Sequence, residues 1–581
     1  MAAISTSCLA TPTANLAQYT LSGAAQLNVS SPTSFVKRNG AKLELDGNEF
    51  RVQGPNVYWL GLDENVIPNP SYPSKARVLE IMAVAKAMGA TTIRSTSLGV
   101  SFGTGLSIEN ALNTFKPDNS AAWDAIDFAL FAARSYGLRL VIPLTDQYDY
   151  YHGGIPTFLR WRNLSSTNFD PFYDLTGQVY QDFRAYIQIL LSHTSPYTNL
   201  TLASDPTVLA FETGNELGGY SGKDYPPPVE WTTAISQYLK ELAPQTLVVS
   251  GSYGVRKDEL EIGSIDIHSD HFYPTYKSRL SSSASTAHSA SKPFLVGEYD
   301  WTNQYYLRFR WGYFLLLLPA LLALGVWFMP KRWWPWSFTL KDLVTCGCCR
   351  RKRRKRRRTT TAEERGEYDR MEGETVALST STAPFDSPSY KPDLNSSHSA
   401  TSIPIFESVP STAHFPRPRN DRPLRIHRWM FSLFLLLLVL PLFGIIYTYL
   451  PTPISPFLSS LSSLETTKTS SSSSSSIGDL YWSLFGRTND GCQYVQHNDG
   501  YTLHYPSDPT ASSGLARGSG DVVVRLTKHA WNVRGETPFW ASSSGVGDGF
   551  DLDKLELRDL PVIAFPQEGL KLANGTVVGG S

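Results

Sequence analysis

In residues 207–216, TVLAFETGNE, an apolar and β-prone run leads into an Asn-Glu pair. A second stretch, residues 293–299, reads PFLVGEY and also brings a glutamate to the end of an apolar run. Runs of this kind are typical of strands buried on both faces of a parallel sheet. The two stretches therefore predict buried strands with Glu216 and Glu298 at their C-terminal ends.

Strand-like and helix-like segments alternate on both sides of these stretches. Strands are expected at residues 51–58, 91–95, 139–144, 207–212, 246–250, 265–272 and 293–296, and an eighth at 478–486. Helices are expected near residues 74–88, 121–136, 177–192 and 229–242. Ahead of them, Asn39-Gly40 and Asp46-Gly47 predict two hairpin turns that cap the bottom of the fold. This alternation indicates an α/β protein, a (β/α)₈ TIM barrel interrupted between strands seven and eight.

The interruption contains two stretches, residues 311–330 and 429–450, that are apolar, nearly uncharged and flanked by Trp and Arg or Lys. They predict a two-helix transmembrane insert, with a pair of buried core helices as the alternative. Between them, residues 350–358 are nine consecutive Lys or Arg residues, followed by a Ser, Thr and Pro rich segment. We expect a disordered cytoplasmic loop whose basic run binds anionic membrane lipid. The alternative interpretations of the basic run are a nuclear signal and a nucleic-acid patch.

The predicted domain organisation follows from these segments. It comprises a flexible lead-in at 1–34, strands one to seven at 35–302, the insert at 303–452, the closure of the barrel at 453–505 and a C-terminal appendage at 506–581. The lead-in lacks the apolar core of a secretory signal, and the appendage contains a β-like run at residues 521–526. Two spans return the chain to its starting side, so we expect a membrane protein with an extracellular barrel; a secreted protein is the alternative.

The charge balance, the cysteines and the glycosylation sequons limit the classes of function and partner that we expect. Acidic and basic residues balance at 52 each, so no overall field favours nucleic acid as a partner. Five cysteines are too few for a disulfide scaffold; Cys8 and Cys492 could pair or stay free. The other three, beside the basic run, are candidate acylation sites: Cys346, Cys348 and Cys349. Glycosylation sequons begin at Asn28, Asn163, Asn199 and Asn574.

The two glutamates carry the functional prediction. The C-terminal ends of barrel strands meet at one face, where catalytic residues converge. Glu216 and Glu298 lie 82 positions apart (298 minus 216), yet this fold makes them neighbours in space. Retaining hydrolysis of a glycosidic bond uses two carboxyl groups roughly 5 to 5.5 Å apart, one protonated and one ionised. The alternative interpretation is that they are unrelated loop glutamates.

Several ordered motifs extend this prediction. They are NVYW at 56–59, Arg94, GNE at 214–216, HFYP at 271–274, GE at 297–298 and YWS at 481–483. With these motifs the chain resembles glycoside hydrolase family 5, and most closely its fungal endo-β-1,4-mannanase-like members, over roughly residues 35–302 and 453–505. The resemblance implies a retaining hydrolase that cleaves internal β-1,4-mannosidic bonds of mannan-type polysaccharides without a metal or cofactor. A β-glucanase of the same family and a non-catalytic membrane-anchored carbohydrate-binding protein are the alternatives.

The resemblance also assigns roles to residues. It implies that Glu216 is the general acid/base and Glu298 the nucleophile, and that substrate is bound by Trp59, Arg94, Asn215, His271, Tyr273 and Trp482. Arg94 is expected to hold Glu298 ionised, while apolar surroundings raise the pKa of Glu216. For His271 the alternative is a hydrogen-bonded core histidine, and for Trp482 it is simple packing. Residues 146–154 are expected to form a loop of the substrate cleft.

Overall fold

The computed structural model divides the chain into two compact units, Met1–Leu315 with Phe443–Ser581, and Leu316–Leu442. The residues that the structure describes are 20–21, 30–65, 70–95, 105–150, 152–220, 222–303, 433, 437, 451–466, 475–497, 499–505, 519–541, 550–571 and 576–579. In the second unit the described residues are Leu433 and Leu437, both helical and exposed. The fold described below is that of the first unit.

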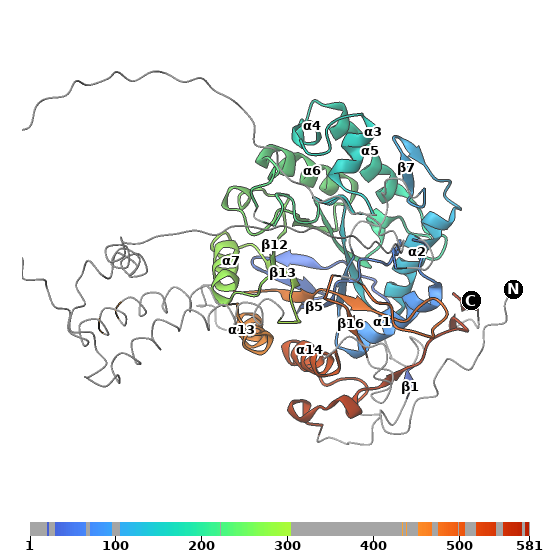
Figure 1. Ribbon diagram of the computed structural model, residues 1–581, viewed down its shortest axis with the longest axis vertical. Helices are drawn as coiled ribbons and strands as arrows, with labels where there is room; N and C mark the ends of the chain where they lie inside the picture. The colour runs from blue at the N-terminus through green and yellow to red at the C-terminus, as the bar shows by residue number, and fades with distance from the viewer. Residues whose placement is uncertain are drawn as a thin grey trace, which may run out of the picture. The chain divides into compact units, whose positions relative to one another are not determined.

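Eight parallel strands form the centre of the fold, hydrogen-bonded in the order β5-β14-β13-β12-β11-β10-β9-β6. Their bounds are β5 Val52–Pro55, β6 Thr92–Arg94, β9 Arg139–Pro143, β10 Val208–Glu212, β11 Leu247–Ser250, β12 Ile267–Phe272, β13 Phe294–Tyr299 and β14 Gly478–Tyr481. The first and last strands of this order also pair, because Val57 N donates to Arg94 O at 2.8 Å and Thr91 N donates to Gln53 O at 2.9 Å. The sheet thus curls into the predicted (β/α)₈ barrel (Figure 1).

The close approach of β5 to β6 depends on a glycine. Gly54 has φ +155°, and a Cβ at this position would lie 2.0 Å from the carbonyl oxygen of Thr92. Inside the barrel, side chains from successive strands, such as Val141, Leu209 and Ile267, form a separate apolar core. This filled interior is typical of the fold, so the site must lie at one end of the barrel.

The predicted hairpin closes the bottom of the barrel. Strands β2 (Lys37–Asn39), β3 (Lys42–Leu45) and β4 (Asn48–Glu49) pair antiparallel, with the turns at the predicted Asn-Gly and Asp-Gly positions. Val36 and Leu43 are buried in the same core as the barrel interior. Within the segment predicted to be a flexible lead-in, Thr20–Leu21 forms β1 and pairs with β17 (Val562–Ile563).

Helices surround the strands as the sequence predicts. Their bounds are α1 Lys75–Ala87, α2 Ala121–Ser135, α3 Ile155–Trp161, α4 Asp170–Tyr173, α5 Gln178–Ser192, α6 Val229–Leu242, α7 Lys277–Ser289, α13 Ile454–Thr466 and α14 Ser519–Arg534. Smaller strands are β7 Glu109–Ala111, β8 Thr114–Phe115, β15 Leu484–Phe485, β16 Leu503–His504, β18 Leu570–Lys571 and β19 Val577–Val578. The apolar faces of the large helices pack on the outside of the sheet in one core.

The prediction of a β-like run at residues 521–526 was wrong, because these residues lie in α14. Val523, Leu526 and Trp531 are buried on one face of this helix, with helical spacing that overrides the β preference of the valines. The Trp531 indole donates to the carbonyl oxygen of Ala87 at 3.2 Å, which ties α14 to the end of α1. The segment predicted to be an appendage therefore supplies the helix that follows β14, beside α13 (Figure 1).

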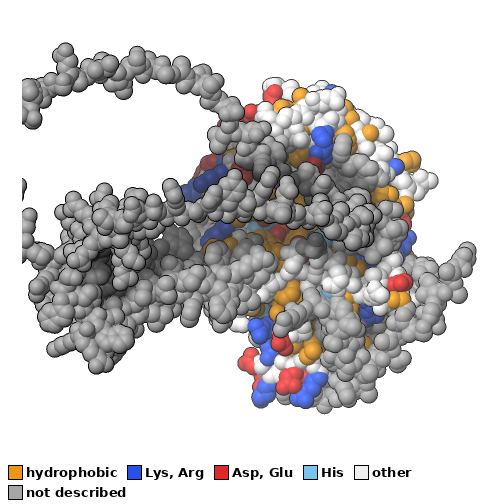
Figure 2. Space-filling model, viewed as in Figure 1, with side chains coloured by type: hydrophobic (Ala, Val, Ile, Leu, Met, Phe, Trp, Pro, Cys, Tyr) orange, Lys and Arg blue, Asp and Glu red, His pale blue; other side chains and the backbone are white. Residues whose placement is uncertain are grey.

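Beyond α14 the chain presents a charged surface. Figure 2 shows acidic and basic side chains gathered where α14 is followed by the short helices η9 (Leu552–Lys554) and η10 (Leu557–Asp559). Lys554 pairs with Asp551, and Arg558 with Glu556, each at 2.8 Å. Such exposed pairs contribute little to stability and mark the outer, solvated side of this segment.

The predicted insert falls between β13 and α13, and the structure describes the chain on either side of it. Its two ends are held together, since Ile454 N donates to Asn303 Oδ1 at 2.6 Å and Thr452 N donates to Thr275 O at 2.6 Å. The predicted spans at 311–330 and 429–450 and the basic run at 350–358 lie outside the described residues, apart from Leu433 and Leu437. Across the described part of the chain, no helix combines the length and apolar character needed to cross a bilayer.

Candidate active site

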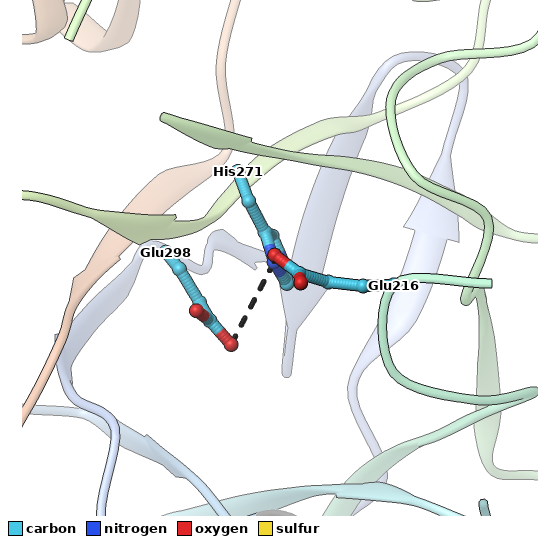
Figure 3. A group of neighbouring side chains, drawn as sticks. All are labelled: Glu216, His271 and Glu298. Atoms are coloured by element: carbon cyan, nitrogen blue, oxygen red, sulfur yellow. Dashed lines mark hydrogen bonds and ion pairs between the residues drawn. The ribbon is translucent and has the colours of Figure 1, made fainter. Parts of the chain in front are cut away.

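The two predicted carboxyl groups meet at the C-terminal end of the barrel. Glu298 is the fifth residue of β13, and Glu216 lies four residues beyond the end of β10. One carboxyl oxygen of each glutamate and one ring nitrogen of His271 lie within 4.8 Å of one another. Figure 3 shows Glu216 and Glu298 approaching His271 from opposite sides. The structure thus brings together the pair that the sequence places 82 positions apart (298 minus 216).

His271, on β12, bridges the two acids. Its Nδ1 lies 2.7 Å from Glu216 Oε1 and 3.6 Å from Glu298 Oε1. Burial lowers the pKa of His271, which favours the uncharged imidazole. Room for this ring depends on Gly297, because a Cβ there would lie 2.8 Å from His271 Nε2. The Gly-Glu motif therefore places the carboxylate and leaves space for the histidine that contacts it.

Arg94, at the end of β6, organises the base of the site. Its guanidinium donates to Glu298 Oε1 at 2.6 Å and to Glu212 Oε2 at 2.7 Å. It also donates to Asn215 Oδ1 at 2.7 Å and to Asn56 Oδ1 at 3.1 Å. Because the Arg94 guanidinium is only 1% exposed, these bonds are needed to compensate for its lost hydration. This single cation positions the Asn of the Asn-Glu motif and one oxygen of Glu298.

The environment of Glu216 favours its protonated form. Burial raises the pKa of Glu216 to about 7, and the nearby carboxylate of Asp146 adds to this effect. Arg94 acts in the opposite direction but bonds directly to Glu298 and not to Glu216. A carboxyl group that holds its proton near neutral pH is suited to general acid catalysis.

Glu298 is held differently. Its Oε2 accepts a hydrogen bond from the Tyr273 hydroxyl at 2.9 Å, and its Oε1 accepts from Arg94. Burial still raises the pKa of Glu298 above its ordinary value, although His271 and Arg94 both lower it. Arg94 acts in the expected direction, but burial has the larger influence on this pKa. Both oxygens nonetheless face donors that stabilise the ionised form, as a nucleophilic carboxylate requires.

The backbone at Glu216 is in an uncommon conformation. Its φ is +50°, in the left-handed region that residues other than glycine rarely adopt. Gly219 N donates to Glu216 O at 2.9 Å, and Leu217 N donates to Gly251 O at 2.9 Å, so neighbouring main chain holds this turn in place. Strain of this kind concentrates at functional sites, where it directs a side chain.

A cavity of about 380 Å³ opens above the two acids. It is lined by aromatic and acidic side chains, with histidine and asparagine: Tyr58, Glu64, Asp146, Tyr148, Tyr150, His152, Asn215, Glu216, Tyr220, Tyr273, Glu298, Trp482, His497, Asp499 and Tyr501. Such a lining, apolar rings with a few convergent polar groups, is typical of a small-molecule site. Its size fits a short sugar segment.

The predicted substrate-binding residues take three positions. Asn215, Tyr273 and Trp482 line the cavity, while Arg94 and His271 lie behind the acids and position them. Trp59 is set apart: its indole is fully buried, donates to Leu484 O at 3.1 Å and stacks on the Arg77 guanidinium. The preceding residue, Tyr58, lines the cavity in its place and stacks on Trp482 with ring centroids 5.4 Å apart.

Several site residues were missed from the sequence. Glu212 ends β10 and pairs with Arg94. The apolar strand run that contains this acid does not indicate which residue pairs with it. His497, Asp499 and Tyr501 reach the cavity from the chain after β15, where no periodic pattern marks them. The predicted cleft loop does line it, through Asp146, Tyr148, Tyr150 and His152, and its partner Tyr220 comes from the loop after β10.

Glu216, His271 and Glu298 also have the types and spacing of metal ligands. The Arg94 guanidinium, however, lies 2.6 Å from one oxygen of Glu298, and the Tyr273 hydroxyl lies 2.9 Å from the other. A bound cation would have to displace this arginine or sit beside its charge. The donor set therefore suits paired acid chemistry better than metal binding.

Comparison with known proteins supports a sugar-cleaving site. Residues 33–277 match a family model described as GH family 5 beta-mannosidase-like. The matched segment includes Glu216 and His271 and ends before Glu298. Mannan endo-1,4-beta-mannosidase 2 of Oryza sativa subsp. japonica is 29% identical over 260 residues, which cover 44% of this chain and 55% of that protein. Mannan endo-1,4-beta-mannosidase 2 of Arabidopsis thaliana is 26% identical over 233 residues, which cover 39% and 51%.

The chain spans about half the length of the curated relatives it matches. Among solved structures, the endo-1,4-beta-mannanase from Rhizomucor miehei is 22% identical, with a TM-score of 0.41, over 47% of this chain and 86% of that one. The curated relatives named above come from plants, so the resemblance to fungal enzymes in particular stays a prediction. Together the family match and the curated relatives support a glycosidase.

Proposed function

We propose that the protein is a retaining glycoside hydrolase that cleaves internal β-1,4-mannosidic bonds of mannan-type polysaccharides. The observation that carries the proposal is the approach of the Glu216 and Glu298 carboxyl oxygens to within 4.8 Å beneath one cavity. Retaining enzymes place their two carboxyl groups about 5 to 5.5 Å apart, whereas inverting enzymes leave about 6.5 to 9.5 Å for a water molecule. The short separation supports double displacement.

In the first step, Glu298 Oε attacks the anomeric carbon of the sugar. The bond from that carbon to the bridging oxygen breaks, and Glu216 gives its proton to this oxygen as the leaving sugar departs. The result is a glycosyl ester on Glu298 and an ionised Glu216. Because Arg94 and Tyr273 bind the Glu298 oxygens, they hold the carboxylate for attack and for its later departure.

In the second step, water replaces the leaving sugar. Glu216, now ionised, accepts a proton from this water, whose oxygen attacks the anomeric carbon and releases Glu298 as a carboxylate. Two inversions restore the original β configuration. Asn215 lines the cavity beside Glu216 and is held by Arg94, so its amide is positioned to bond a sugar hydroxyl. His271 contacts Glu216 throughout and keeps it aimed at the bridging oxygen.

The choice of mannan as substrate is supported by the names of the relatives, which are mannan endo-1,4-beta-mannosidases. The test is a product profile on β-mannan, with the anomeric form of the first products read by NMR. We expect manno-oligosaccharides of several lengths, released as β-anomers. Initial α-anomers would contradict retention, mannose alone would contradict internal cleavage, and faster turnover of cellulose or laminarin would favour a glucanase.

We also propose that the barrel lies on the extracellular side, anchored by the apolar stretches 311–330 and 429–450, with the basic run 350–358 on anionic lipid. Cys492 is disulfide-bonded, and disulfides persist in oxidising compartments. The sequons at Asn163 and Asn199 are exposed on the barrel. We expect endoglycosidase to increase the gel mobility of the protein and carbonate washing to leave it in membranes. A soluble glycoprotein would mean secretion, and an unglycosylated protein protected in intact cells would contradict the proposal.

A further inference from the structure

A bidentate ion pair joins α7 to β12 behind the candidate active site (Figure 1). The Arg279 guanidinium, on α7, donates to Asp270 Oδ1 at 2.5 Å and to Asp270 Oδ2 at 3.1 Å. Asp270 precedes His271 on β12, and its side chain is only 1% exposed. One turn further along α7, Ser283 Oγ donates to Asp270 Oδ2 at 2.7 Å. Neither member of the pair lines the cavity, so the pair acts on the site from behind.

The pair anchors the backbone of His271. The N–H of His271 donates to Asp270 Oδ1 at 2.8 Å, and this oxygen also accepts from Arg279. Between Asp270 and His271 the pairing of β12 with β13 shifts register. Because the ladder is disrupted at such an irregularity, the Asp270 side chain is an additional anchor there. His271 Nδ1 lies 2.7 Å from Glu216 Oε1, so the anchor also helps to fix this contact.

The same guanidinium reaches the support of the turn that carries Glu216. It donates to the Tyr253 hydroxyl at 3.0 Å and lies over the Tyr253 ring, 4.7 Å from its centroid. Tyr253 follows β11, and its backbone N–H donates to Leu217 O at 2.9 Å. Leu217 is next to Glu216, whose backbone has a φ of +50°. One side chain, Arg279, therefore contacts the supports of both the acid and the histidine that touches it.

We propose that Arg279 is a positioning residue, which sets the contact between His271 and Glu216 by holding the two segments that carry them. This proposal rests on the proposed function, because the contact affects the reaction only if Glu216 is the general acid. A planar guanidinium suits this role, since its fork bonds both oxygens of one carboxylate in a fixed orientation while a further N–H bonds Tyr253. A lysine ammonium keeps the charge but cannot reproduce this geometry.

The charge of Arg279 is also within reach of Glu216. Burial raises the pKa of Glu216, and Arg279 is one of the cations that oppose this rise. Arg279 could therefore act through its charge or through the positions of the segments that it holds. A substitution that keeps the charge and removes the bidentate geometry separates these two effects.

Two substrates separate a misplaced acid from a damaged fold. Hydrolysis of mannotetraose needs a proton for the sugar that leaves, whereas β-mannobiosyl fluoride has a leaving group that needs little assistance from an acid. A misplaced Glu216 should therefore lower kcat/KM for mannotetraose and spare kcat/KM for the fluoride, which reports the first step. A smaller folded fraction would lower both values equally.

The test uses Asp270→Asn/Arg279→Met and Arg279→Lys. The double variant removes both charges, so it leaves no unpaired charge buried. We expect its kcat/KM to fall by about tenfold for mannotetraose and by less than about twofold for the fluoride. Arg279→Lys should lose about threefold on mannotetraose, because a single ammonium cannot hold both segments.

A second bidentate pair provides the matched control, Asp182→Asn/Arg162→Met. The Arg162 guanidinium donates to both oxygens of Asp182 at 2.8 Å. Its side chains are 31% and 2% exposed for Arg and Asp, against 30% and 1% in the pair of Arg279 and Asp270. Neither Arg162 nor Asp182 lines the cavity. We expect the control to stay within about twofold of wild type on both substrates, since this pair supports neither Glu216 nor His271.

A measurement without turnover separates this proposal from the proposed reaction. Nitrogen-15 NMR shifts of the His271 ring, assigned with a His271→Gln variant, report its contact with Glu216. We expect these shifts to change in Asp270→Asn/Arg279→Met and to stay unchanged in the control. If the wild type hydrolyses neither substrate but the shifts change in this way, the positioning role stands and the proposed reaction fails. Unchanged shifts, equal losses on both substrates, or wild-type kinetics of Arg279→Lys would overturn the positioning role.

Discussion

Two buried clusters of acids and histidine occur in the same barrel and differ in what surrounds them. Glu216, His271 and Glu298 lie at the C-terminal end of the strands, and Glu465, Asp479 and His529 lie between the sheet and the helices α13 and α14. In each cluster the ligand-type atoms lie within 4.8 Å of one another, and all six residues are buried. By residue type and spacing alone, the two clusters are nearly equivalent.

The two clusters differ in whether a ligand can reach them. The first cluster opens to a cavity of about 380 Å³, whereas Asp479 and His529 adjoin a void of about 10 Å³. The second cluster is also tied into its surroundings, because His529 Nε2 lies 2.8 Å from Asp479 Oδ2 and its Nδ1 lies 3.0 Å from Ser462 Oγ. Gln53 Nε2 adds a bond to Asp479 Oδ2 at 2.9 Å. The same residue types are therefore suited to chemistry where a ligand can enter, and they hold elements together where it cannot.

The largest expected effect is that of removing the proposed nucleophile, Glu298. Glu298→Ala is expected to lower kcat on β-mannan by about 10⁴-fold or more, since Glu298 is the group proposed to form the glycosyl ester. Azide should restore turnover of β-mannobiosyl fluoride and give the α-mannobiosyl azide, because azide attacks from the face that Glu298 occupied. Little loss of activity, or a β-configured azide, would mean that Glu298 is not the nucleophile.

Removing the proposed general acid, Glu216, should have a somewhat smaller and pH-dependent effect. Glu216→Ala is expected to lower kcat on mannotetraose by about 10²- to 10⁴-fold. Because the pKa of Glu216 is raised to about 7 and the proposed first step needs its proton, wild-type kcat/KM should fall as pH rises through about 7. The variant should lose this alkaline limb and retain most of its kcat/KM for β-mannobiosyl fluoride, which reports the first step, while its kcat falls because Glu216 is also the proposed base of the second step. A limb that persists in the variant would assign the titration to another group.

Substitutions in the second cluster should change the stability of the fold and leave catalysis nearly unchanged. Asp479→Ala removes the partner of buried His529, so we expect a loss of about 3 to 5 kcal/mol in the free energy of unfolding. Urea denaturation measures the loss, and kcat of the folded fraction at low temperature should stay within about twofold of wild type. A large fall in kcat with unchanged stability would show that the two clusters are not functionally separate.

The smallest expected effect is a gain in stability. Burial, followed by the charge of Asp479, raises the pKa of Glu465 well above its ordinary value. A glutamate whose pKa is higher in the folded than in the unfolded protein stabilises the fold in its protonated form. This stability is fully present below the unfolded pKa of about 4.3 and is lost as pH rises toward the folded pKa. Glu465→Gln mimics the protonated form without this cost. We expect its Tm at pH 7 to rise by about 2 to 4 °C, and its advantage over wild type to vanish near pH 4. An equal Tm difference at both pH values would contradict the raised pKa.

Local pattern was enough to predict most of the fold. Buried strands such as β10 and β13 are continuous apolar runs, and the Asn-Gly and Asp-Gly turns predict the hairpin at the bottom of the barrel. The eighth strand, β14, was found across the long interruption because its composition is also strand-like. Helix α14 was misread because consecutive valines favour a strand locally, while packing against α1 and α13 decides for a helix.

The candidate site was predicted only in part because contacts between remote segments decide it, as they do for α14. Glu216 and Glu298 follow strand runs, so their place at one face of the barrel follows from the sequence. Trp59 and Tyr58 are adjacent, yet one is fully buried beside Arg77 and the other lines the cavity, and only the path of the chain after β5 decides which. Tyr220 joins Tyr148 across two loops, a contact that no local period encodes.

The repeated strand and helix pattern, and the two glutamates that follow strands, can be predicted from local sequence, because burial and turn chemistry act over a few residues. Only the tertiary structure decided that these glutamates face one cavity, while Glu465 and Asp479 are sealed behind helices. It also decided which of these acids keep a proton, since burial and the nearest charges set each pKa. The physical reason is that desolvation and charge depend on distances between segments that are remote along the chain.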